Sequence, residues 1–529
     1  MLRFPSRDSR VRGAAMLAAA CLLLAACGGG APSTAPKQGG TLTTAVGIDA
    51  DTLDPAGQTT TTIAQIVDMM VETLVTIDRQ GHIRPLLATS WSESSNGLSW
   101  TFTLRRGVRF QDGEHLDAQA VKTSIDRLLS PSTRKALPGA LRVIKDVTAV
   151  DAQHVRFDLA QPFAPFLAAM TQTQAAILAP RSLNRAPNTP AQVVRPVGTG
   201  PYEFKQWVRE DHVTMVRFPG YWGRKPSYQT QVYKIVPEAA ARESLVKAGQ
   251  ADVAYLPPPN DLPALAHADG VRVVLGPSDR TIEVQINTQS ATQPLLHQAA
   301  VRQALNYAIN RDAIVRNVIF GAGRQDDSTM ASSVFGYCAA GDYRYDPARA
   351  KRMLQAAGAE GMTVHFISPQ GRYIADYDVA QAVAGNLRAV GVNVDLANPI
   401  DWPTYIARTH VPPQKATFDM AFNGWAPAFL DASDNLREFE KSNWPPGGSA
   451  FSYYDDPQVD QLIARADAES GQSQRKRDFC KAEKTVWSAA PWIFLYTQKN
   501  PFITTSKVTG VVGMPNEKFV TTWASPAAS

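Results

Sequence analysis

Hydrophobic and polar residues alternate at strand-like and helix-like intervals along most of this chain. Between 98 and 110, aromatic and aliphatic residues alternate with threonine and arginine, which predicts a strand that ends at the turn 111–113. After this turn Asp117 is placed to cap a helix, in which apolar residues recur every three or four positions up to Leu129. A strand followed closely by a helix is therefore expected in this part of the chain.

In the rest of the chain, segments with the periodicity of a strand again occur among segments with the periodicity of a helix. Further strands are expected at 155–159, 213–218, 232–236, 271–275 and 282–286, with a helix at 238–248. Later helices are expected at 299–310, 347–357 and 377–390, with strands at 363–367 and 392–396. Helices that alternate with short strands predict an α/β fold.

The first residues indicate export. A head with four arginines precedes an apolar run from Ala14 to Leu24, which is the pattern of a bacterial signal peptide. This run is too short to stay as a helix across about 30 Å of hydrocarbon. It ends in Leu24-Ala25-Ala26-Cys27, which predicts a lipoprotein signal peptide at 1–26 and a lipid on Cys27. The alternative is an ordinary cleavage site with an incidental cysteine.

The segment after this cysteine indicates a tether. Residues 27–39 are rich in Gly, Pro, Ser, Thr and Ala and contain too little apolar surface to fold. The folded body is therefore expected to begin near Gly40. About 490 residues then remain, more than the roughly 250 to 300 that one core accommodates, so at least two lobes are expected.

Loss of the signal peptide also changes the net charge. It removes four of the 53 Lys and Arg residues and one of the 48 Asp and Glu residues, which leaves 49 against 47 and a charge near +2. Nucleic-acid binding requires a clustered basic face, so this balance gives it no support.

Export also determines the expected state of the cysteines. Of the four cysteines, Cys21 leaves with the signal peptide and Cys27 is lipidated. Cys338 and Cys480 remain where disulfides are permitted, so one bridge between them is expected. Two unpaired buried thiols are the alternative.

Several short motifs follow one another through nearly all of the folded part. They are Leu53-Asp54-Pro55, Ala88-Thr89-Ser90-Trp91, Asn96-Gly97-Leu98-Ser99-Trp100-Thr101-Phe102-Thr103-Leu104, Gly107-Val108-Arg109-Phe110, Gly198-Thr199-Gly200-Pro201-Tyr202, Gly249-Gln250-Ala251-Asp252-Val253 and Val301-Arg302-Gln303-Ala304-Leu305. In these motifs the chain resembles the family 5 extracellular solute-binding proteins, which serve peptide, opine and nickel ABC importers. The motif between 88 and 113 marks the fold and does not itself bind ligand.

This resemblance implies an α/β fold of the two-lobed periplasmic-binding-protein type, a type II clamshell of the large cluster with an inserted subdomain. Lobe I would comprise 40–80, 195–285 and 496–529, the insert 81–194, and lobe II 286–495. Extended segments at 283–288 and 494–498 would cross between the lobes, which would close around a ligand at the hinge.

The resemblance also implies a function. The protein would be the solute-binding component of an ABC importer and not an enzyme. It would capture a peptide or peptide-like ligand and deliver it to the permease and ATPase complex. We expect a monomer in the periplasm or on the outer face of a bacterial membrane, anchored through Cys27, without cofactor, metal or nucleic acid.

One loop carries the main ligand hypothesis. Trp425, at the end of a buried strand, is expected to contact the ligand or to fill the core beside the hinge. In peptide-binding relatives an aspartate three residues later pairs with the ligand's amino terminus, but here that residue is Ala428. Asp431 or Asp434 could replace this aspartate, and a solvated loop or a helix cap is the alternative for both. An uncompensated buried ammonium would be costly.

Five more residues are candidates for ligand contact. Tyr255 and Leu256 stand where relatives place contacts to the ligand. Arg372 could bind a carboxylate through two parallel hydrogen bonds, or could be an ordinary surface arginine. Trp402 could line the cleft or pack in the core, and Thr60 could donate its hydroxyl or cap the following helix.

The same residues bear on other functions. An opine, a sugar or a nickel complex is compatible with the same fold, since fold does not fix function. Nickel prefers histidine and sulfur ligands, and the eight histidines are scattered singly. An exported hydrolase would need a nucleophile with its base or a metal site, and the sequence has no Gly-x-Ser-x-Gly, His-Glu-x-x-His or Cys-x-x-Cys motif.

Overall fold

The computed structural model describes residues 39–58, 60–133 and 139–528. The signal peptide at 1–26, Cys27 and nearly all of the tether at 27–39 lie outside these ranges. None of the helices in the described ranges combines the length and the apolar character needed to cross a membrane.

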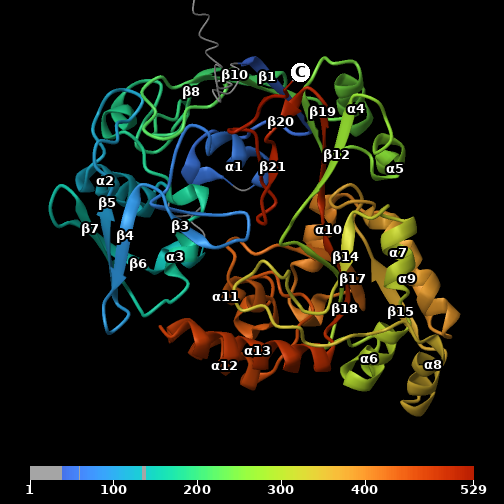
Figure 1. Cartoon of the computed structure of the whole chain (residues 1–529). Coiled ribbons are helices and arrows are strands. Elements are labelled where there is room, and N and C mark those ends of the chain that lie inside the picture. The colour runs from blue at the N-terminus through green and yellow to red at the C-terminus, as the bar shows by residue number, and fades with distance from the viewer. Residues whose placement is uncertain (1–38, 59, 134–138, 529) are drawn as a thin grey trace, which may run out of the picture. The chain divides into compact units, whose positions relative to one another are not determined.

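The first lobe is built on a seven-stranded sheet with the order β12-β19-β11-β1-β10-β9-β8 (Figure 1). Its strands are β1 (Gly39–Val46), β8 (Tyr202–Val208), β9 (His212–Arg217), β10 (Tyr228–Ile235), β11 (Val253–Tyr255), β12 (Val271–Gly276) and β19 (Asn500–Thr505). β1 pairs in parallel with both β10 and β11, and the other pairs are antiparallel. Val46, Tyr233 and Phe502 are buried in its core. The helices α1 (Thr61–Val67), α4 (Ala239–Lys247) and α5 (Leu262–Leu265) belong to this lobe.

The insert is built on a four-stranded antiparallel sheet with the order β4-β5-β7-β6. Its elements are β4 (Ala88–Glu93), β5 (Ser99–Leu104), α2 (Ala118–Leu129), β6 (Ile144–Ala149), β7 (His154–Leu159) and α3 (Phe166–Ala169), preceded by the hairpin β2 (Val75–Ile77) and β3 (Ile83–Pro85). The predicted cap is confirmed, since Asp117 accepts a hydrogen bond from the Ala120 amide at 2.8 Å. β5 is shorter than predicted because the chain turns at Gly107, whose φ of +76° suits glycine.

The second lobe is built on a six-stranded sheet with the order β14-β18-β13-β17-β15-β16. Its strands are β13 (Thr281–Ile286), β14 (Gly323–Gln325), β15 (Thr363–Ile367), β16 (Asn393–Leu396), β17 (Met420–Trp425) and β18 (Trp492–Gln498). Its helices are α6 (Ala299–Tyr307), α7 (Arg311–Asn317), α8 (Pro347–Ala356), α9 (Asp376–Ala389), α10 (Trp402–Thr409), α11 (Ala432–Leu436), α12 (Pro457–Ala468) and α13 (Gln472–Ala489). Most of these agree with the predicted α/β pattern, although α6 ends earlier because Asn310 already caps α7.

The crossings between the two large sheets differ from those expected. Segments 283–288 and 494–498 were predicted to connect the lobes, but β13 pairs with β17 and β18 along its length and so belongs to the second sheet. The chain instead crosses at 277–280, between β12 and β13, and at Lys499, between β18 and β19. The sequence missed this because a hinge segment and an adjoining sheet strand are both extended, and period alone cannot separate them.

After β19 the chain stays in the first lobe. The short pairs β20 (Val508–Thr509) with β23 (Ser525–Pro526) and β21 (Val512–Gly513) with β22 (Phe519–Val520) form there. Phe519 packs on Tyr255 with 4.7 Å between ring centroids, and its amide donates to Gln65 of α1. The last part of the chain is therefore fixed against the first lobe.

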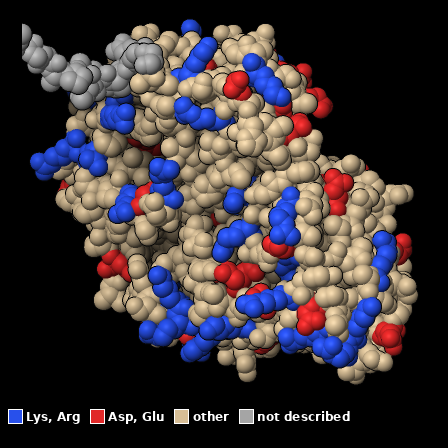
Figure 2. All heavy atoms as spheres, turned by 45° about the vertical axis from the view of Figure 1, so that its right-hand side comes forward, with Lys and Arg blue, Asp and Glu red and all other residues tan. Residues whose placement is uncertain are grey.

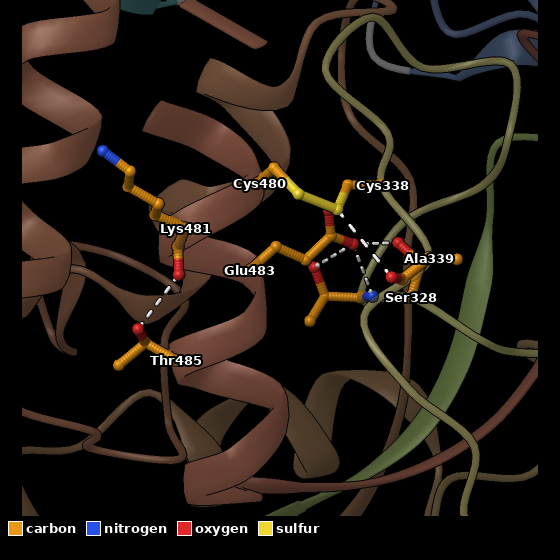
Figure 3. The surroundings of a disulfide bond; sticks show 8 residues. Ser328, Cys338, Ala339, Cys480, Lys481, Glu483 and Thr485 are labelled. Carbon is orange, nitrogen blue, oxygen red and sulfur yellow. Dashed lines mark hydrogen bonds between the residues drawn. A yellow bond between two sulfur atoms is a disulfide. The ribbon is translucent and has the colours of Figure 1, made fainter. Parts of the chain in front are cut away.

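A disulfide joins Cys338 and Cys480, whose Cα atoms are 5.4 Å apart (Figure 3). Cys480 lies on α13, and Cys338 lies on the long segment between β14 and α8. Beside the bond the Glu483 carboxylate accepts from the Thr329 amide at 3.0 Å and from the Ser328 hydroxyl. Burial raises the pKa of Glu483 to about 8. Both contacts fasten the segment from 326 to 343 to α13.

The charged residues on the surface have mixed signs. On the face shown in Figure 2, basic and acidic side chains are interspersed over the surface. Exposed pairs such as Arg316 with Asp312 follow the i, i+4 spacing of a helix, and each contributes less than about 1 kcal/mol.

Candidate functional site

A cleft of about 400 Å³ lies between the lobes. The first lobe contributes Thr60 and the segment around Glu517, the insert contributes 171–174, and the second lobe contributes residues before α9, on α10 and after β17. The crossing segment contributes Asp279 and Arg280. A volume of this size accommodates a small organic ligand.

Arg372 gives the cleft an accessible positive charge. Its side chain is exposed, and its guanidinium carbon lies 5.1 Å from the ring centroids of both Tyr373 and Trp402. Trp402, at the start of α10, also stacks on Tyr405 with 5.4 Å between centroids. Within the described ranges, the Arg372 guanidinium makes no hydrogen bond or ion pair, although its charge contributes to lowering the pKa of Glu517. The rings hold it in place and leave its hydrogen-bond donors free.

A second arginine, Arg280, uses its guanidinium donors in hydrogen bonds within the protein. Arg280 donates from Nε and Nη2 to the two carboxylate oxygens of Glu517, at 2.8 and 2.6 Å. Its Nη1 donates to the Gly424 carbonyl at 2.9 Å. Burial opposes ionisation of Glu517, but the Arg280 charge outweighs it and lowers the pKa of Glu517. This pair ties the crossing segment to β17 of the second lobe and to the C-terminal segment of the first.

Asp279 stands beside this pair without a partner of its own. Its side chain is only 2 % exposed, and Oδ1 has no hydrogen-bond partner among the described residues. Burial, and then repulsion from Glu517, raises the pKa of Asp279 well above its usual range. Sequence reasoning missed Asp279, Arg280 and Glu517, because they meet only through contacts between residues more than two hundred positions apart.

At the floor of the cleft, three polar side chains are linked by hydrogen bonds. The Asn423 amide oxygen accepts from the Tyr373 hydroxyl at 3.1 Å, and its nitrogen donates to Glu283 at 3.0 Å. Glu283 is buried on β13, and burial raises the pKa of its carboxyl to about 8. These bonds hold Asn423 and Tyr373 in fixed orientations under the ligand space.

Four of the predicted ligand residues do line the cleft, namely Thr60, Arg372, Trp402 and Trp425. Thr60 precedes α1 but its hydroxyl makes no capping bond. Trp425 packs partly against the core of the second lobe, and its indole Nε1 has no acceptor among the described residues. Thr60 of the first lobe and Arg372 of the second therefore offer accessible donors in the cleft.

Asp431 and Asp434 do not line the cleft, in contrast to the prediction. Asp431 is 3 % exposed, caps α11 at the Ser433 amide, and accepts from Arg475 Nη2 at 2.8 and 3.0 Å. Asp434 accepts from the Ala428 amide at 2.6 Å and from Arg437 at 3.0 Å. Both carboxylates are committed to the loop after β17 and to nearby arginines.

Tyr255 and Leu256 also lie outside the cleft. Tyr255 is buried against Phe519, and its hydroxyl donates to the Glu517 carbonyl at 3.4 Å. The Leu256 carbonyl accepts from Arg242 at 2.8 Å, and its amide donates to Pro501. The C-terminal segment covers this position, which could not be read from the residues around 255.

Together, two lobes on separate sheets and a polar cleft at their crossing define a protein that encloses a small ligand. The model of the bacterial extracellular solute-binding proteins, family 5, matches residues 82–446, and the chain belongs to this family. It is thus the substrate-binding component of an ABC importer and not an enzyme, and it works in the extracellular or periplasmic space.

Known relatives agree with this assignment. The glutathione-binding protein GsiB of Pectobacterium atrosepticum is 29 % identical over 479 residues, which are 90 % of this chain and 92 % of the relative. The Helicobacter pylori periplasmic binding protein DppA, solved with the peptide STSA, has a TM-score of 0.76 at 25 % identity, covering 93 % of this chain and 99 % of that one. NikA from Brucella suis, solved with Fe(III)-EDTA, has a TM-score of 0.82 at 24 % identity, covering 92 % and 100 %, and shows the fold. The predicted α/β periplasmic-binding-protein fold is confirmed.

Proposed function

We propose that this protein captures a small peptide-like ligand whose carboxylate binds Arg372. The observation that carries the proposal is the guanidinium of Arg372, which lines the cleft, stacks on two aromatic rings and has free donors. A planar guanidinium binds a carboxylate through two parallel hydrogen bonds. Relatives named for glutathione and solved with a peptide support a ligand of this class.

The cleft also suits the remainder of such a ligand. Its lining combines aromatic surface from Trp402 and Trp425 with the hydroxyl of Thr60 and the amide of Asn423. The rings can cover apolar side chains, and the polar groups can pair with peptide units. A volume of about 400 Å³ limits the enclosed part of the ligand to a few residues.

Replacement of Arg372 tests this function. Arg372→Gln should weaken binding of glutathione and of the tetrapeptide Ser-Thr-Ser-Ala by about 10- to 100-fold, because a charge-assisted carboxylate contact contributes about 1.5–3 kcal/mol. Isothermal titration calorimetry measures both affinities, and a C-terminally amidated tetrapeptide should bind wild type as weakly as the variant binds the free acid. Arg352→Gln, an exposed arginine on α8, is the matched control and should leave both affinities unchanged.

Native mass spectrometry of the purified protein supplies the opposing outcome. A spread of peptide masses retained by wild type and lost from Arg372→Gln supports the proposal. A single non-peptide mass such as a sugar, an opine or a metal complex would contradict it, as would equal retention by the two proteins.

We further propose that a lipid on Cys27 anchors the protein to a membrane. The support is the sequence Leu24-Ala25-Ala26-Cys27 after an apolar run, followed by the tether. More than one acyl chain is needed for stable anchoring, and a lipidated amino-terminal cysteine carries more than one. Cys27→Ser should move the exported protein from the membrane fraction to the soluble fraction, as seen by immunoblotting. Wild-type protein found in the soluble fraction would refute the anchor.

A further inference from the structure

Asp279 lies on one of the two segments that connect the lobes. It lies on the crossing segment 277–280, two residues before Thr281, which pairs with Trp425 across β13 and β17. Asp279 therefore lies on the segment that links the lobes, close to the loop that follows Trp425. Asp279 and this loop line the same cleft.

Within the described residues the fold supplies no hydrogen-bond donor to Oδ1 of this carboxyl, although the nearby Arg280 charge acts on it. The adjacent Arg280 directs Nε and Nη2 to Glu517 and Nη1 to the Gly424 carbonyl, so none of these donors reaches Asp279. Asp434 is also close enough to repel it electrostatically. A buried carboxylate with an unpaired oxygen is costly unless a donor arrives from elsewhere.

A ligand can supply the missing donor. The unpaired Oδ1 is the kind of acceptor that an ammonium group satisfies, with a hydrogen bond and a positive charge together. Burial, and then repulsion from Glu517, raises the pKa of Asp279, and a cation placed beside the carboxyl would oppose that rise. Arg372 lies in the same cleft with the opposite charge, so the two ends of a zwitterion have separate partners.

We propose that Asp279 binds the ammonium group of the ligand whose carboxylate Arg372 holds. This role rests on the proposed function and extends it, because it restricts the ligand to compounds with a free amino group. Asp431 and Asp434, which the sequence suggested for this role, are already bonded to arginines and to backbone amides. The specificity for the amino end would thus come from the crossing segment between the lobes.

The test compares free and acetylated amino groups in one mixture. Purified protein is freed of bound ligand by reversible denaturation and then offered an enzymatic casein digest, half of which carries isotope-labelled N-acetyl groups. Native mass spectrometry reads which peptides are retained. Wild type should retain free-amine peptides at least tenfold over their acetylated forms, and Asp279→Asn should bring this ratio close to one. Asp269→Asn, an exposed aspartate before β12, is the matched control and should keep the wild-type ratio.

Three results would overturn the proposed role of Asp279. Equal retention of both forms by wild type overturns the role of Asp279 and leaves the proposed peptide-like ligand intact. A preference for free amines that persists in both Asp279→Asn and Asp279→Ser overturns it too. Retention of neither form by wild type refutes the peptide-like ligand, and the role of Asp279 falls with it. The wild-type comparison holds even where a variant does not fold.

Discussion

Asp431→Asn is expected to lower the free energy of unfolding by about 3–5 kcal/mol, because it removes the one carboxylate that the buried Arg475 guanidinium contacts within the described residues. Both side chains are nearly inaccessible, at 4 and 5 % exposure, and Nη2 of Arg475 contacts both carboxylate oxygens. The measurement is urea unfolding followed by tryptophan fluorescence. Ligand affinity, measured on the folded variant, should be close to that of wild type, since Asp431 does not line the cleft.

A double replacement separates the ion pair from the rest of the loop. Asp431→Leu combined with Arg475→Met removes both charges, and most of the lost stability should return. About 1 kcal/mol should stay lost, because Asp431 also caps α11. A large loss of ligand affinity in folded Asp431→Asn, with little change in stability, would mean that the sequence interpretation of Asp431 as a ligand contact was right.

Loss of the disulfide should lower the free energy of unfolding by a similar amount. The bond between Cys338 and Cys480 closes a loop with a sequence separation of 142 residues. The chain-entropy model assigns a loop of that length about 5 kcal/mol of stabilisation. Cys338→Ser with Cys480→Ser is therefore expected to unfold at clearly lower urea concentration than the oxidised wild type.

Reduction gives an independent comparison. Wild type in excess dithiothreitol should unfold at the same urea concentration as the double serine variant, and the variant should not respond to the reductant. The fastened segment also touches the loop after β17, because the amide of Phe335 donates to Leu430 and its carbonyl accepts from Ala432. A stability change below about 1 kcal/mol would contradict the entropic account.

Much of the fold could be predicted because it depends on local periodicity. The strands β13 and β16 and the helix α9 lie within one residue of their predicted ranges, since their apolar residues recur with periods near 2 and 3.6. Arg372 and Trp402 were identified from residue type alone, as a free cation and a large aromatic near a loop. Their mutual stacking was not foreseen, because it joins a turn before α9 to the start of α10.

The charged groups of the cleft could not be assigned from sequence for a physical reason. An aspartate reads the same in sequence whether its partner is water, an arginine or nothing. Asp431 is bonded because it caps α11 and because Arg475, which lies 44 residues farther along, folds back onto it. Asp279 lacks such a partner because Glu517, from the far end of the chain, has taken Arg280. Which carboxylate pairs with which arginine is determined only by the three-dimensional fold.

The order of strands in the first sheet has a consequence for secretion. β1 forms near the beginning of the folded chain, whereas β12 joins the sheet only through β19, at Asn500–Thr505. A chain that emerges from its exporter amino end first exposes β11 and β12 with unpaired edges until these late residues appear. Glu517, which neutralises Arg280, emerges later still. In such a chain the first sheet is incomplete and Arg280 lacks its partner until these late residues emerge, so the cleft is among the last parts of the molecule to be completed.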